Sequence, residues 1–236
     1  MSVAVEPLPR DTPVGVVDDN SDDAYVTSLV LRQAGYAPIE IGPSESLDGL
    51  VERLSNECQA AVCDHRLNAK KRIKFTGAQL VYRVTLDRNM PAVLNTTWAS
   101  VDQDTSIRRW RSGIPSLLDK SDQTSATLTE ALAIAAAEAR GETPRDRVAH
   151  PAAVQIVDVH LQEEWQTADV LVPAWRMSTV VRLPLEQITQ DTGLNVTELR
   201  GRWLEADVNC YARHPRDLFF RSFKVAPELP EGWLSN

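Results

Sequence analysis

The chain has 236 residues, of which 43% are hydrophobic and 25% are charged, and its formal net charge is -8. This composition is typical of a folded protein with one large domain or two small ones. The acidic balance excludes broad electrostatic attraction to nucleic acid or to anionic membranes, so a nucleic-acid site would have to be local. Because we find no membrane-length apolar run and no secretory signal, we predict a cytoplasmic protein without a membrane partner.

Between residues 14 and 140 the sequence alternates short apolar runs with longer amphipathic segments. The apolar runs predict strands, and the segments with hydrophobic residues at spacings of three and four predict helices. We expect strands over residues 14–17, 37–41, 60–63, 91–94 and 116–118. We expect helices over residues 25–34, 46–56, 77–86, 107–110 and 127–140. Such alternation is typical of an α/β fold, a parallel sheet covered by helices.

A change of pattern near residue 145 predicts two domains. The segment 142–150 shows no periodicity and contains several turn formers, so we interpret it as a linker. Beyond it, apolar and polar residues alternate with a period of two, which favours strands. We therefore predict a first domain over 12–141 and a smaller β-rich domain over 151–236, built as an antiparallel sheet or a barrel.

Chemically selective side chains follow the predicted strands of the first domain. Asp18 and Asp19 follow the first strand and Asp64 the third, while Thr96 and Lys120 follow the fourth and fifth. The carboxyl ends of parallel strands meet at one edge of the sheet, so these side chains are expected to converge. Three carboxylates in one place repel unless a cation lies among them, and Mg²⁺ prefers such oxygen ligands. Lys120 and Thr96 add the positive charge and hydroxyl donor that a phosphoryl group needs.

With these residues in place, the segment 14–141 resembles the receiver domain of two-component response regulators. The matching stretches are Val16-Val17-Asp18-Asp19, Val62-Cys63-Asp64, Pro91-Ala-Val-Leu-Asn-Thr96, Gly113 and Leu117-Leu-Asp-Lys120. The resemblance covers a little over half of the chain. It implies a flavodoxin-like, doubly wound, five-stranded parallel sheet.

The resemblance also implies roles for the residues at the strand ends. Asp18, Asp19 and Asp64 would hold Mg²⁺, and Asp64 would accept a phosphoryl group from a sensor histidine kinase or a phosphotransfer protein. Thr96 would contact the phosphoryl group and Lys120 would pair with it. The domain would catalyse its own phosphorylation and hydrolysis without being a stand-alone metabolic enzyme.

Some features depart from the family pattern. The segment between Asp64 and Gly77 is longer than usual and carries a basic run, with Lys70, Lys71, Arg72 and Lys74. It is either a solvated insertion or a surface that docks a kinase or binds anions. In addition, Ser121 replaces the usual proline after the lysine, and Leu117 replaces the usual switching aromatic. These departures leave open a phosphorylation-independent pseudo-receiver scaffold as the alternative.

The function of the second domain follows less directly from its sequence. We expect its aromatic residues to form a small core or, alternatively, a face that docks a partner; they are Trp165, Trp175, Trp203, Tyr211, Phe219, Phe220, Phe223 and Trp233. The stretch 185–204 superficially resembles a helix-turn-helix, which would make the protein a DNA-binding regulator. However, 12 acidic residues outnumber 8 basic ones from His150 onward, which disfavours nucleic acid. We therefore expect an output protein as the partner, and a homodimer is a further possibility.

Overall fold

The computed structural model describes residues 6–43, 46–67, 73–97, 105–161, 166–213 and 215–226. These residues form two compact units that divide between Pro144 and Arg145, with the segment 105–109 grouped with the second unit. This division lies within the predicted linker 142–150, although the exact limits of the domains stay a prediction. Of the helices in the described parts of the chain, none is both long and apolar enough to cross a membrane.

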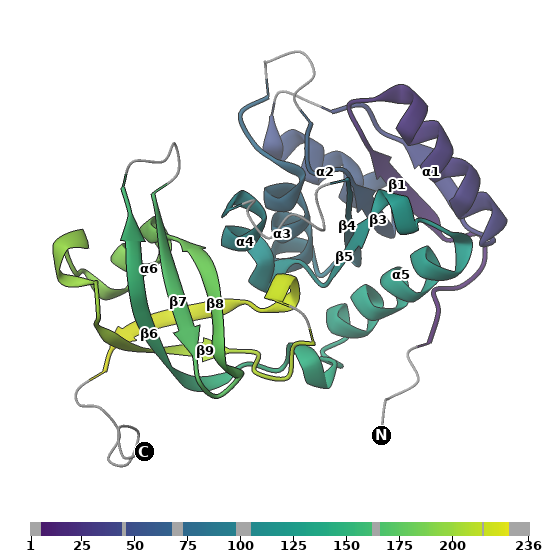
Figure 1. Ribbon diagram of the computed structural model, residues 1–236. Coiled ribbons are helices and arrows are strands. Elements are labelled where there is room, and N and C mark those ends of the chain that lie inside the picture. The colour runs from purple at the N-terminus through teal and green to yellow at the C-terminus, as the bar shows by residue number, and fades with distance from the viewer. Residues whose placement is uncertain are drawn as a thin grey trace. The chain divides into compact units, whose positions relative to one another are not determined.

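A five-stranded parallel sheet forms the centre of the first unit (Figure 1). Its strands are β1 (Pro13–Val17), β2 (Ala37–Glu40), β3 (Ala60–Cys63), β4 (Ala92–Thr96) and β5 (Ser116–Asp119). They lie in the order β2-β1-β3-β4-β5, and every neighbouring pair is parallel. This is the flavodoxin-like strand order, so the predicted fold class is confirmed for this unit.

Four helices follow the strands and cover the sheet: α1 (Ser21–Gln33), α2 (Leu47–Glu57), α3 (Gly77–Arg88) and α5 (Ser125–Ala139). The short helix α4 (Thr105–Trp110) lies almost wholly in the segment grouped with the second unit. Val14 and Val16 of β1 belong to a core shared with residues of α1 and α5, whereas the intervening Gly15 faces Leu54 of α2. The sheet is therefore buried on both faces, which explains why its strands are continuous apolar runs.

Four of these helices begin at a polar residue whose side chain accepts a backbone N–H of the first turn. The capping residues are Asn20 for α1, Ser46 for α2, Thr76 for α3 and Thr124 for α5. Such caps satisfy donors that have no partner inside the helix. They fix where each helix begins, and hence the length of the loops at the carboxyl edge of the sheet.

A five-stranded antiparallel sheet dominates the second unit (Figure 1). Its strands are β6 (His150–His160), β7 (Thr167–Val172), β8 (Arg176–Pro184), β9 (Trp203–Val208) and β10 (Phe220–Val225). In the order β10-β9-β6-β7-β8, the outer strands β10 and β8 are not paired with each other in the described residues. Of the two predicted architectures, the antiparallel sheet is therefore the one observed in the described part of this unit.

The stretch 185–204, which superficially resembles a helix-turn-helix in sequence, does not form one. The first helix is present as α6 (Leu185–Thr192), which ends at Gly193 in the left-handed conformation. The expected second helix is only a single 3-10 turn, Val196–Glu198. Gly201, at a φ of 75°, and the start of β9 leave no room for a second helix. The segment therefore lacks a recognition helix.

The aromatic residues of the second unit divide into core and surface. Phe219, Phe220 and Phe223 are buried, whereas Tyr211 is 50% exposed. Trp175 and Trp203 are partly buried, and Trp165 and Trp233 lie outside the described residues. Of the three phenylalanines, Phe220 and Phe223 belong to the hydrophobic core of the second unit, where their rings stack.

Candidate functional site

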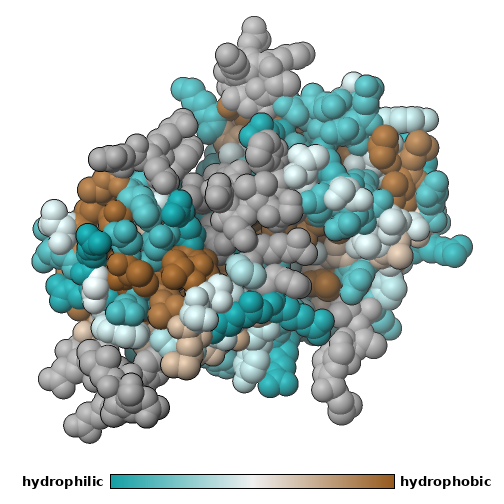
Figure 2. All heavy atoms as spheres, viewed as in Figure 1, coloured by the Kyte–Doolittle hydropathy of each residue, from teal (hydrophilic) through white to brown (hydrophobic). Residues whose placement is uncertain are grey.

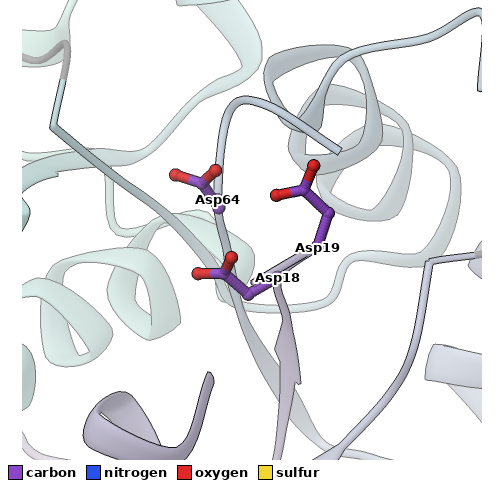
Figure 3. Close-up of side chains that lie close together, drawn as sticks. All are labelled: Asp18, Asp19 and Asp64. Atoms are coloured by element: carbon purple, nitrogen blue, oxygen red, sulfur yellow. The ribbon is translucent and has the colours of Figure 1, made fainter. Parts of the chain in front are cut away.

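Three aspartates meet at the carboxyl edge of the parallel sheet (Figure 3). Asp18 and Asp19 directly follow β1, and Asp64 directly follows β3, the neighbouring strand. One carboxylate oxygen from each of the three lies within 4.8 Å of the others. We call these residues the acidic cluster. Their proximity is what the parallel pairing of β1 with β3 requires.

Lys120 joins the acidic cluster from the end of β5. Its Nζ donates to Asp18 Oδ2 at 2.7 Å and to Asp23 Oδ2 at 2.9 Å, and it lies 3.3 Å from Asp64 Oδ1. The lysine side chain is only 13% exposed, so these contacts are screened less than those of a surface ion pair. One ammonium thus contacts three carboxylates, which lie after β1, in α1 and after β3.

Burial sets the electrostatics of the two most enclosed groups. Removal from water raises the pKa of the Asp18 carboxyl above its ordinary value, although bonds from Lys120 and from the Asn20 backbone oppose this. Burial lowers the pKa of Lys120, but hydrogen bonds to Asp18 and Asp23 and the charge of Asp64 outweigh it, so the net shift is upward. The lysine therefore remains charged at neutral pH, while the ionised form of Asp18 is costly.

The acidic cluster has the chemistry of a site for a hard divalent cation. Its three carboxylates supply only oxygen ligands, and their mutual distances allow one ion to contact all three. Burial raises the pKa of Asp18, so its ionised form destabilises the folded state, and a nearby cation would reduce this free-energy cost. The residues at this edge therefore fit a Mg²⁺ or Ca²⁺ ion.

Thr96, the fourth predicted site residue, is the last residue of β4 and is completely buried. Its Cα pairs with that of Asp119, the residue before Lys120. Thr96 therefore lies at the same edge of the sheet as the acidic cluster. Its distance to a phosphoryl group stays a prediction.

Next to Thr96, a pair of buried amides links β4 with the loop after β5. Asn95 Nδ2 donates to Gln123 Oε1 at 2.9 Å, and Thr27 Oγ1 of α1 approaches the same oxygen at 3.5 Å. Asn95 Oδ1 and Gln123 Nε2 have no hydrogen-bond partner among the residues that the structure describes. Since Gln123 follows Lys120 by three residues, this bond helps to fix the loop that carries the lysine.

Sequence reasoning missed Gly77, the first residue of α3. A Cβ atom at this position would stand 1.6 Å from the backbone oxygen of Asp64, which no side chain can tolerate. The Gly77 N–H donates to the backbone oxygen of His65 at 2.8 Å. The glycine thus allows α3 to begin directly against the backbone of Asp64. A glycine after a long loop gives no signal of this close approach in the sequence.

A pocket of about 620 Å³ lies beside Asp19. It is lined by Asp19, His65, Arg66, Leu67, Ile73, Lys74, Phe75 and Thr76. Arg66 and Lys74 add basic groups to its wall, and the Arg66 backbone N–H donates to Asp64 Oδ2 at 3.1 Å. Of the predicted basic loop, Lys74 belongs to this pocket, whereas Lys70, Lys71 and Arg72 lie outside the described residues.

No family model and no curated protein sequence matches the chain. Its N-terminal part is similar to solved structures, among them a response regulator receiver domain protein from Clostridium thermocellum. That match has 18% identity and a TM-score of 0.44, and it covers 55% of this chain and 97% of the other.

Two further solved structures are similar over the same part. A response regulator receiver domain protein from Methanospirillum hungatei has 19% identity and a TM-score of 0.42, with 56% of this chain and 98% of that one covered. A response regulator from Burkholderia pseudomallei, solved with a phosphorylated aspartic acid, a calcium ion and citrate, has 20% identity and a TM-score of 0.42. That match covers 56% of this chain and 72% of the other. These likenesses concern the fold of the first unit alone, and the antiparallel sheet of the second unit remains unassigned.

Proposed function

We propose that the first unit is a receiver domain that accepts a phosphoryl group on Asp64, with Mg²⁺ held by Asp18, Asp19 and Asp64. The observation that carries this proposal is the contact of Lys120 with Asp18 and Asp64 at the edge where the acidic cluster meets. Carboxylates, an ammonium and a cation site in one place are what phosphoryl transfer requires.

The transfer is an exchange of one bond to phosphorus for another. A carboxylate oxygen of Asp64 attacks the phosphorus of a phosphohistidine, the O–P bond forms, and the N–P bond breaks. The electron pair of that bond stays on the imidazole nitrogen, which takes up a proton as it leaves. The ammonium of Lys120 and the hydroxyl of Thr96 would stabilise the negative charge on the transferred oxygens.

A bound Mg²⁺ would neutralise part of the charge on the carboxylates and the phosphoryl oxygens. Within the protein, Asp18 is held by the Asn20 N–H at 2.9 Å and Asp64 by the Arg66 N–H at 3.1 Å. These backbone bonds orient the two carboxylates before any ligand arrives. Their role is preorganisation, which lowers the cost of assembling the site.

An exposed apolar patch on α1, the helix that follows Asp18 and Asp19 in the chain, supports a protein as the phosphoryl donor. Tyr25, Val26 and Leu29 of α1 are 55%, 53% and 39% exposed. Figure 2 shows hydrophobic residues among hydrophilic ones over α1. Because α1 begins only three residues after Asp18, a protein docked on this helix would bring a phosphohistidine close to Asp64. We propose a sensor histidine kinase or a phosphotransfer protein as this partner.

We propose that the second unit transmits the signal by binding an output protein. The segment 185–204 has no recognition helix that could enter the major groove, so we do not propose DNA binding through it. Strands β6 to β9 expose alternate side chains on the face opposite the core, and Val157 and Val180 are 42% and 48% exposed. A mixed apolar and charged sheet face of this kind suits a protein partner.

The phosphorylation proposal is tested by mass spectrometry of the intact protein after incubation with Mg²⁺ and a small acyl phosphate. We expect the wild type to gain the mass of one phosphoryl group, and the Asp64→Asn variant to gain none. Asp48→Asn, which neutralises an 81% exposed carboxylate on α2, serves as the control and should be modified like the wild type. Unmodified wild type, or an undiminished gain in Asp64→Asn, would favour the pseudo-receiver alternative.

A further inference from the structure

A fourth carboxylate, outside the acidic cluster, contacts the functional lysine. Asp23 lies in the first turn of α1, and its Oδ2 accepts a hydrogen bond from Lys120 Nζ at 2.9 Å. Its side chain is 44% exposed, in contrast to 4% for Asp18 and 9% for Asp64. In the sequence, Asp23 is indistinguishable from an ordinary acidic residue at the start of a helix.

We propose that Asp23 is a positioning residue that holds Lys120 before phosphorylation and must release it when the phosphoryl group arrives. This inference rests on the proposed function. It predicts that Asp23 slows the phosphorylation of Asp64.

The number of donors on the lysine gives the first argument. An ammonium has three N–H donors, and Lys120 uses two of them in hydrogen bonds to Asp18 and Asp23, at 2.7 and 2.9 Å, while Asp64 lies 3.3 Å away as an ion pair. A phosphoryl group that takes more than the third donor of the lysine must therefore displace one of these two carboxylates. The phosphoryl group and the carboxylates thus compete for the N–H donors of Lys120.

Exposure decides which carboxylate gives way. Asp18 is almost completely buried and is held in addition by the Asn20 N–H, so its release would leave an unpaired buried charge. Asp64 is itself the proposed acceptor. Asp23 reaches solvent, and water can replace the lysine there at small cost. Asp23 is therefore the contact that breaks first.

The same carboxylate also adds negative charge near the path of an anionic donor. This long-range effect would be shared by any acidic residue in the first turn of α1, whereas the hydrogen bond to Lys120 is specific to Asp23. Asp22 is the matched control, because it lies in the same turn and is exposed, and its backbone N–H donates to Asn20 Oδ1. Comparing variants at Asp22 and Asp23 therefore separates the effect of the hydrogen bond to Lys120 from the long-range effect of the negative charge.

The test measures the rate constant of phosphorylation by a small acyl phosphate at saturating Mg²⁺, followed as mass gain of the intact full-length protein. We expect Asp23→Asn to react roughly two- to fivefold faster than the wild type, the range that a half-exposed ion pair corresponds to. Asp22→Asn should change the rate by less than about half of that factor, since it removes only the screened charge. Asp23→Glu should keep the slow rate, because a longer carboxylate can still reach the lysine.

A faster rate is a gain that damage to the fold would not produce. An unchanged or slower rate in Asp23→Asn, or an equal acceleration in Asp22→Asn, would overturn the proposal for Asp23 while leaving phosphorylation of Asp64 intact. If the wild type takes up no phosphate at all, the proposed function fails, and the role of Asp23 fails with it.

Discussion

The two sheets of this protein gather charged side chains in opposite ways. The parallel sheet brings together residues that lie far apart in the sequence, Asp18, Asp64 and Lys120, and leaves more negative than positive charge at its edge. The antiparallel sheet places His160, Asp169 and Arg182 side by side on strands β6, β7 and β8. There, Asp169 accepts from Arg182 Nε at 2.9 Å and lies 2.8 Å from His160 Nε2, so its charge is matched.

The difference shows in the protonation of the two aspartates. Burial raises the pKa of Asp18 despite its bond to Lys120. For Asp169, burial also raises the pKa, but the hydrogen bonds from Arg182 and His160 outweigh it, and the net shift is downward. The proposed site therefore has an excess of negative charge. In the second sheet, the hydrogen bonds of Asp169 with Arg182 and His160 stabilise the fold instead. Substitutions at four positions test this difference between the two units.

The largest effect is expected from Gly77→Ala in the first unit. The added Cβ would collide with the backbone of Asp64, so α3 or the loop after β3 must move. We expect a loss of about 3 kcal/mol or more in the free energy of unfolding of this unit, together with loss of phosphorylation. Denaturant titration and the mass assay measure the two effects.

Gly49→Ala in α2 provides the control for this substitution. Its added Cβ would meet only Ser46, at the ordinary contact distance of 3.5 Å. Since alanine favours a helix interior, stability should rise by up to about 1 kcal/mol. If Gly77→Ala were equally harmless, the backbone of Asp64 would not depend on the close approach of α3.

A second large effect is expected from Asn209→Ala in the second unit. The fully buried amide donates to the backbone oxygens of Asp146 and Asp217 at 2.8 and 2.9 Å, and its Oδ1 accepts the Phe219 N–H at 2.7 Å. Loss of three buried bonds should cost about 3 kcal/mol. The unfolding of the second unit would report this loss, with little change in the phosphorylation of the first.

Thr197→Ala, at an exposed position in the same unit, should change stability by less than about 0.5 kcal/mol. A cost for Asn209→Ala no larger than this would mean that the buried amide does not hold the start of the second unit in place.

The smallest effects are expected from neutralising the two contrasted aspartates, and they should differ in sign. In the absence of divalent ions, Asp18→Asn should raise the stability of the first unit at pH 7, because it removes a buried charge in excess. Asp169→Asn should lower the stability of the second unit at pH 7. Each change should be on the order of 1 kcal/mol, and denaturant titration from pH 7 to pH 3 measures both.

The signs follow from the direction of each pKa shift. The pKa of Asp18 is raised above 3.8, so the folded state binds a proton more readily, and acidification from neutral pH toward 3.8 recovers stability. The pKa of Asp169 is lowered below 3.8, so its contribution is present above that value and is lost as the pH falls through the folded pKa. Equal signs for the two variants at pH 7 would contradict the proposed difference between the sheets.

The strands and most of the proposed site were predictable from the sequence because the signals are local. An apolar run such as Ala60–Cys63, followed by Asp64, predicts both a strand and the residue that lies at its carboxyl end. The convergence of Asp18, Asp64 and Lys120 then follows from parallel pairing, without knowledge of the side-chain packing.

The remaining features depend on contacts between distant segments. The bond of Asp23 to Lys120 spans 97 positions in the sequence, and the approach of Gly77 to Asp64 depends on the course of the loop between them. In the second unit, the pattern after Leu185 superficially resembles two helices. The left-handed turn at Gly201 and the pairing of β9 with β6 outweigh the helical pattern after Asn195.

One outer strand of each sheet, β2 in the first and β10 in the second, carries an interruption that affects self-association. In β2, Ala37 and Ile41 donate their N–H groups toward β1, so the nitrogen of Pro38 faces the free edge, where it offers no hydrogen. In β10, Ser222 has a φ of 54° within an irregular stretch between Arg221 and Lys224. Each interruption prevents a strand of another molecule from forming a regular row of backbone hydrogen bonds with this edge. These two edges are consequently poor templates for aggregation.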